Sequence, residues 1–174
     1  MKTIGRTGAV VLLAAAVAAG CGTAEAEKPG AEGGPAAKST QAIPHTCTLL
    51  PKAEAEAVAG EPLGEPKKGP EAPASADVTA SQCLYASSDG MRSMSVLVRH
   101  SKKGDNEPGY ARGAMKSSGM TVTDVPGLGD AAFWTGGQLQ AFKGRHVQVV
   151  VSMIGFERPE ERATAAARKL LEKL

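Results

Sequence analysis

The three cysteines of this sequence are the residues whose types and spacing most directly indicate chemistry, and the first of them follows an export signal. A basic start with Lys2 and Arg6 precedes an uncharged run of Ala, Val and Leu at residues 9–19. Gly20 and Cys21 come next and complete the three-part layout of a secretory signal. The apolar run is shorter than the roughly 20 residues that cross a ~30 Å hydrocarbon core, so we expect export and no permanent span here.

The thiol of Cys21 is the expected point of lipid attachment. Residues 17–21, Val-Ala-Ala-Gly-Cys, are similar to the lipobox, whose cysteine takes a diacylglyceryl thioether before a peptidase cuts in front of it. Two acyl chains anchor a protein stably, because each buried methylene contributes roughly 0.8 kcal/mol. We therefore predict a signal peptide at residues 1–20 and, through lipidated Cys21, a place on the outer face of the cytoplasmic membrane. A secretory signal that ends at a cysteine by chance is the alternative.

Cys47 and Cys83 are the cysteines that remain once Cys21 is lipidated. An even pair in an oxidising compartment most simply forms one disulfide. A metal site of His45 with both cysteines is the alternative, and it lacks a fourth ligand at ordinary zinc spacing. A nucleophilic cysteine would need a histidine partner that the sequence does not indicate. We expect a disulfide and no cofactor.

The other side chains that could do chemistry do not form a known catalytic pattern. His45, His100 and His146 lie far apart in the sequence and outside the motifs of zinc proteases, serine hydrolases and thiol proteases. The Gly-rich residues 125–130 could cradle an anion ahead of a helix, but a strand pattern follows them. No pair of carboxylates stands out as general acid and base. We predict a non-catalytic protein, with a hydrolase as an alternative.

Charge and composition exclude nucleic acid as the expected partner. Residues 1–20 hold two of the 20 basic residues and none of the 18 acidic ones, so the mature chain has 18 of each sign. Nucleic-acid-binding domains usually combine a basic face with aromatic side chains for stacking. Here the basic residues are scattered and aromatic residues make up only 3% of the chain.

The segments that carry these residues differ in composition. Residues 21–41 consist of small, polar and charged residues without apolar periodicity, so we expect a disordered tether behind the lipid. Residues 42–174 suit a single domain. Within that domain, residues 61–79 hold four prolines among Gly, Lys and Glu. We predict a mobile loop there, which neither pairs into a sheet nor continues a helix.

The domain is predicted to be α+β, with an antiparallel sheet of about five to six strands packed by about three helices. Apolar spacing and cap residues predict helices at residues 51–60, 108–118 and 159–174. Alternating apolar residues and Gly-rich turns predict strands at residues 82–86, 91–100, 121–124, 131–135, 138–142 and 146–154. Apolar residues on both faces of the last strand indicate a central position. The amphipathic C-terminal helix is expected to dock on the sheet; a helix lying on the membrane surface is the alternative.

Several short motifs, in this order, resemble a known family. The chain contains Cys-Thr-Leu-Leu at 47–50, Cys-Leu-Tyr at 83–85 and Gly-Leu-Gly-Asp-Ala-Ala at 127–132, then a strand and an Ala/Leu-rich C-terminal helix. Over residues 45–174 this order resembles the actinobacterial lipoproteins of the domain of unknown function 3558 family. The resemblance implies paired cysteines and a location at the cell surface. That family has no established activity, so the resemblance implies no ligand and no catalytic residue.

The adjacent aromatics Phe133 and Trp134 are the candidate binding residues. Neighbours on a strand point to opposite faces, so one of the two rings is left open if helices cover a single face of the sheet. A large exposed ring is typical of a binding surface. If helices cover both faces, both rings belong to the core. We predict a lipoprotein that binds a small molecule, an envelope component or a protein; an accessory subunit of a membrane complex is the alternative.

Overall fold

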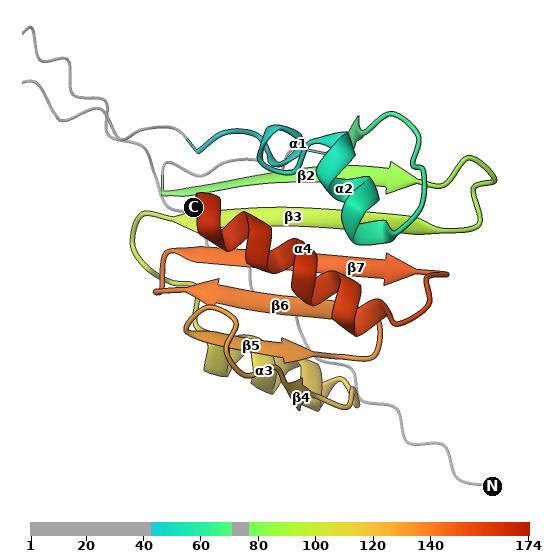
Figure 1. Ribbon diagram of the computed structural model, residues 1–174. Helices are drawn as coiled ribbons and strands as arrows, with labels where there is room; N and C mark the ends of the chain where they lie inside the picture. The colour runs from blue at the N-terminus through green and yellow to red at the C-terminus, as the bar shows by residue number, and fades with distance from the viewer. Residues whose placement is uncertain (1–42, 71–76) are drawn as a thin grey trace, which may run out of the picture. The chain divides into compact units, whose positions relative to one another are not determined.

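The computed structural model describes residues 43–70 and 77–174, where an antiparallel sheet of seven strands forms the frame of the domain (Figure 1). The strand order is β1-β2-β3-β7-β6-β5-β4. The predicted signal peptide, lipidated Cys21 and tether at residues 21–41 lie outside the described residues. The strands are β1 (Lys67–Lys68), β2 (Val78–Ala86), β3 (Ser93–Ser101), β4 (Thr123–Asp124), β5 (Ala131–Trp134), β6 (Gln138–Lys143) and β7 (Val147–Ile154).

Helices cover both faces of this sheet. Figure 1 shows α1, α2 and α4 on one face, which we call the front face, and α3 behind β5 on the other, the back face. The predicted α+β class, with an antiparallel sheet and a C-terminal helix, is confirmed. In the part of the chain that is described, no helix is long and apolar enough to cross a membrane. The helices are α1 (Thr46–Leu49), α2 (Lys52–Ala59), α3 (Pro108–Ser117) and α4 (Pro159–Lys173).

The central position predicted for the strand at residues 146–154 is confirmed, because β7 pairs with β3 on one side and with β6 on the other. Its alternate residues Val149 and Val151 are fully buried on the front face. The intervening Gln148 and Val150 point to the back face and are only partly buried. The two faces of the sheet therefore differ in how completely they are covered.

The C-terminal helix docks on the front face, as predicted. Its apolar stripe is buried against β6 and β7, and small alanines in that stripe let the helix backbone approach the sheet closely. At the end of α4, the Lys173 ammonium donates to the Leu49 carbonyl at 2.8 Å and to the Glu54 carboxylate at 2.7 Å. These bonds connect α4 with α1 and α2. The buried residues of α4 are Ala163, Ala166, Ala167, Leu170 and Leu171.

The first predicted helix is confirmed as α2, which follows Pro51 and ends at Gly60. Gly60 adopts a left-handed φ of 70°, a conformation that residues with a side chain rarely take. The short helix α1 before it was not predicted, since four residues are too few to show apolar periodicity. A disulfide of 2.03 Å between Cys47 and Cys83 joins α1 to β2, so the predicted pairing of these cysteines is confirmed.

The prediction that residues 61–79 form an unpaired loop is wrong in two places. Lys67 and Lys68 pair with Leu84 and Cys83 as the edge strand β1, and residues 78–79 begin β2. The prolines do not prevent this pairing, because those at 66 and 70 flank the two paired lysines and leave their N–H groups available. Lysines and prolines are also usual on an edge strand, where they discourage pairing with another chain.

Candidate functional site

Phe133 and Trp134, the predicted binding residues, point to opposite faces of β5, but neither ring is exposed. The Trp134 side chain lies in the front core with 8% of its surface accessible, and Phe133 is fully buried on the back face. There the Phe133 ring stacks on Phe142 at 6.0 Å and lies 5.2 Å from the Arg112 guanidinium. Helices cover both faces at this strand, so both rings belong to the core, which was the alternative to an exposed aromatic surface.

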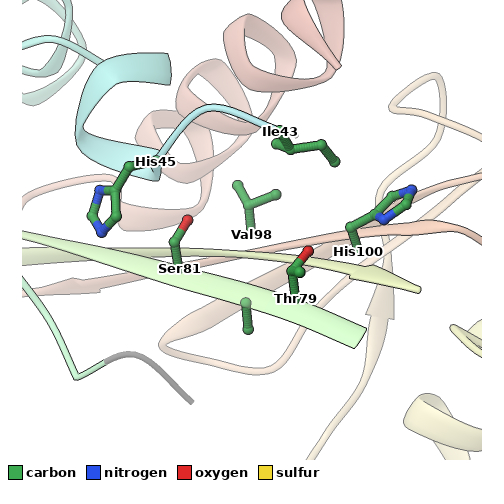
Figure 2. A pocket seen from close by; sticks show the side chains of 7 residues that line it. Ile43, His45, Thr79, Ser81, Val98 and His100 are labelled. Carbon is green, nitrogen blue, oxygen red and sulfur yellow. The ribbon is translucent and has the colours of Figure 1, made fainter. Parts of the chain in front are cut away.

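A different site lies at the edge of the front face, where the segment before α1 crosses the start of β2 and the end of β3. Figure 2 shows His45 and His100 at the two ends of this site, with Ile43 above Val98 between them. We call it the front cavity, and its volume is about 230 Å³. It is lined by Ile43, His45, Thr79, Ala80, Ser81, Val98 and His100.

Two attachments to β2 fix the segment that covers the front cavity. The Thr46 amide donates to the Ser81 hydroxyl at 3.0 Å, and the Thr46 hydroxyl donates to the Ser81 carbonyl at 2.7 Å. Thr46 is fully buried. The disulfide between Cys47 and Cys83 adds a covalent link one residue further along. The front cavity is therefore preformed, so less conformational entropy is lost when a ligand binds.

One nitrogen of the His45 imidazole is a buried polar atom of the front cavity that has no partner among the described residues. Its Nδ1 accepts a hydrogen bond from the Cys47 amide at 3.2 Å and caps the start of α1. An imidazole nitrogen that accepts has no proton, so in the neutral ring the proton is on Nε2. Nε2 is buried and has no hydrogen-bond partner among the described residues. His45 therefore presents a buried N–H donor that is free to bind an acceptor.

His100 closes the other end of the front cavity and is uncharged near neutral pH. Burial lowers the pKa of His100, and the electrostatic effects of the neighbouring His146 and Lys102 lower it further. The His100 and His146 rings are stacked, with their centroids 6.3 Å apart. Among the described residues, no carboxylate, lysine or arginine lines this cavity. A neutral ligand therefore fits it better than an ion, because an ion would lose its hydration without gaining an opposite charge.

The hydroxyls of the front cavity differ in what they can offer a ligand. The Ser81 hydroxyl lies 2.6 Å from the Thr46 hydroxyl and is used in holding α1. Thr79 is exposed at the mouth and accessible to a ligand. Within residues 43–70 and 77–174, no group of three or more His, Cys, Asp or Glu side chains is arranged to hold a metal. The arrangement offers hydrogen bonds and apolar contacts from Ile43 and Val98.

The sequence did not predict that His45 and His100 line the same cavity. Two signals were nevertheless present. His45 lies two residues before Cys47, so the disulfide places it beside β2. Counting back from the Asp-Gly turn pairs Thr79 with His100, which puts that histidine at the same end of the hairpin. Neither signal indicated that the segment before α1 covers the strand ends.

The chain matches no protein-family model, and no curated protein matches it. The likeness to the domain of unknown function 3558 family stays a prediction.

Proposed function

We propose that this chain is a lipid-anchored, non-catalytic protein on the outer face of the cytoplasmic membrane, and that it binds a small neutral molecule in the front cavity. The observation that carries the proposal is the unpartnered His45 Nε2–H. A buried donor without an acceptor costs about 1–3 kcal/mol, and a ligand oxygen or nitrogen facing Nε2 would recover that free energy. The resemblance to actinobacterial lipoproteins agrees with the proposed location.

Binding is tested by native mass spectrometry of the mature chain after incubation with the small-molecule fraction of a bacterial envelope extract. We expect a non-covalent adduct and a rise in melting temperature, because a ligand that binds only the folded state stabilises it. The His45→Asn variant should lose both, since asparagine keeps a cap for α1 and is too short to replace Nε2–H. Thr48→Asn is the control, because Thr48 is exposed on α1 and does not line the cavity. An adduct that survives His45→Asn places binding elsewhere.

The anchor is tested separately with Cys21→Ala. We expect this variant to take up no labelled fatty acid and to leave the detergent phase, because its only predicted lipid attachment is gone. The unaltered chain should label and partition into detergent. If both forms behave alike, the anchor part of the proposal is wrong, while ligand binding by the domain is still measurable on its own.

An accessory subunit of a membrane complex is the second candidate function. Three apolar side chains near the end of the sheet at the β2–β3 turn favour it, because they are more exposed than a core-forming residue would be: Leu84 at 37%, Ile154 at 64% and Met91 at 75%. Gentle solubilisation of membranes distinguishes the two functions. A membrane protein that co-purifies in fixed proportion, and is lost in an Ile154→Asp variant, supports the accessory role.

A further inference from the structure

A second cavity lies on the back face, between α3 and the sheet. α3 covers this region without burying any of its own residues. The sheet side chains beneath it are nevertheless buried, with Phe142 at 1% and Gln140 at 3% exposure. The space between helix and sheet is about 310 Å³, which reaches the lower end of the range typical of small-molecule sites. We call it the back cavity.

A buried acceptor in the back cavity has no partner. Asn106 lines the cavity and is 2% exposed. Its backbone amide donates to the Arg145 carbonyl at 3.0 Å, and its side-chain Nδ2 donates to the His146 carbonyl at 2.8 Å. These two bonds fix the orientation of the side chain. Its Oδ1 is buried without a hydrogen-bond partner among the described residues, so it is positioned to accept from a ligand.

Two glutamines extend this polar side of the back cavity across the sheet. The Gln148 Nε2 donates to the Gln140 Oε1 at 2.9 Å, and both residues line the cavity. Each amide group has donors and an acceptor. After this bond, Gln140 still has donor hydrogens and Gln148 still has its acceptor oxygen. Together with Asn106 Oδ1, these amides therefore give the cavity both accepting and donating positions.

The charged side chains at the back cavity neutralise one another. Arg99 lies 3.2 Å from the Asp105 carboxylate, and Glu107 forms an ion pair with Arg145. A hydrogen bond with Ser101, followed by the charge of Arg99, lowers the pKa of Asp105, so its carboxylate stays ionised and paired. An anionic or cationic ligand would have to compete with these pairs. The lining therefore favours an uncharged ligand.

The back cavity also has an apolar part. Met115 on α3 and the Phe142 ring on β6 line it, and the Tyr110 ring, 82% exposed, stands at its mouth. We propose that this cavity binds one neutral sugar unit. A sugar hydroxyl both donates and accepts, which suits amides that offer acceptors and donors, and the C–H face of a sugar ring packs on apolar and aromatic side chains. This site shares no residue with the front cavity.

The test is a side-chain amide NMR titration of the ¹⁵N-labelled mature chain in detergent micelles. The probes are D-glucose, D-mannose and D-arabinose, with D-glucuronate as an anionic match for glucose. We expect at least one neutral sugar to shift the amide signals of Asn106, Gln140 and Gln148 in a saturable way at millimolar concentration. Glucuronate should bind more weakly. If no sugar shifts these signals, water alone occupies the cavity and the proposal is overturned; preferential binding of glucuronate overturns the neutral class.

Two variants locate the site, and a third controls for changes in α3. Asn106→Ala should weaken sugar binding about tenfold, the usual effect of one lost hydrogen bond. Ala111→Leu fills the cavity from a partly exposed helix position and should abolish binding without unfolding the domain. Ser117→Leu adds the same side chain outside the cavity and should leave binding unchanged. Binding that persists in Ala111→Leu, or that disappears in His45→Asn, overturns the assignment to the back cavity.

Discussion

The front and back faces of the same sheet are covered by helices in opposite ways. On the front, α4 buries five residues and a disulfide fastens α1 to β2. On the back, α3 buries none of its residues, although Phe133 and Phe142 beneath it are shielded. Glycines with positive φ lie on either side of α3, at Gly104 and Gly119. Only the front face therefore has a helix locked into the core.

This difference indicates which face of the sheet contributes most to the stability of the domain and which face has the more mobile helix. Most of the favourable free energy of folding comes from apolar area removed from water, and that area lies between the front helices and the sheet. A helix that contributes little to the core can move without unfolding the domain. The back face therefore has the looser cover, while the front cavity is fixed in shape.

Removing the disulfide should cause the largest loss of stability. In the double variant Cys47→Ala/Cys83→Ala, the free energy of unfolding should fall by roughly 3–4 kcal/mol, because the bond closes a long loop in the unfolded chain. The two cysteines are 36 residues apart in the sequence. Denaturant unfolding measures the change. A loss below about 1 kcal/mol would show that hydrogen bonds from Thr46 hold α1 without the covalent link.

A matched pair of truncations compares the two faces directly. Leu170→Ala on α4 should destabilise the domain by about 3 kcal/mol, because the side chain is fully buried and leaves a cavity. Met115→Ala on α3 should cost less than about 1 kcal/mol, since this side chain is only partly buried. Urea unfolding of both variants provides the comparison. Equal losses would contradict the idea that α3 is loosely packed.

Tyr85 makes the free energy of unfolding depend on pH in the alkaline range. Burial, with a smaller effect from the charge of Glu54, raises the pKa of Tyr85 from 10.0 to about 12. Between these values the unfolded chain has released the proton that the folded chain keeps, so stability falls as pH rises. Below pH 10 this contribution is fully present. The loss should reach up to about 2 kcal/mol across the interval.

Tyr85→Phe isolates this effect from the titration of other groups. The variant should lack the Tyr85 part of the alkaline slope and, at neutral pH, should be about 1 kcal/mol less stable. The second effect follows because the Tyr85 hydroxyl donates to the Leu50 carbonyl inside the core. Urea unfolding of both proteins at a series of pH values gives the difference. Parallel pH profiles would place the phenol in contact with solvent.

The sequence predicted those parts of the fold that depend on local patterns. β7 was placed at the centre of the sheet from its own apolar residues, and α2 was bounded by Pro51 and Gly60. The disulfide followed from the count of cysteines. Lys67 and Lys68 were missed because two residues carry no periodicity, and their pairing depends on where β2 lies.

The candidate sites were harder to predict, because each depends on contacts between distant residues. His45 and Val98 meet only when α1 is fastened across β2, and Asn106 reaches its partners about 40 residues further along the chain. Whether both Phe133 and Trp134 are buried depended on whether α3 covers the back face. The Gly-containing pattern of that helix did not decide this. A lone unpartnered atom such as His45 Nε2 has no signature in the sequence.

The smallest predicted effect concerns Gly113 and tests whether the sequence of α3 itself makes this helix loosely packed. Gly113 lies in the middle of α3, and an added Cβ would meet nothing within 4 Å. Alanine is favoured over glycine inside a helix by about 0.5–1 kcal/mol, so Gly113→Ala should stabilise the domain slightly and slow hydrogen exchange in α3 selectively.

Gly129→Ala is the contrasting control, because its Cβ would lie in contact with the Phe142 carbonyl and its φ is 61°. That variant should be destabilised. If Gly113→Ala slows exchange in α4 as much as in α3, the two helices unfold together and the back cover is no looser than the front.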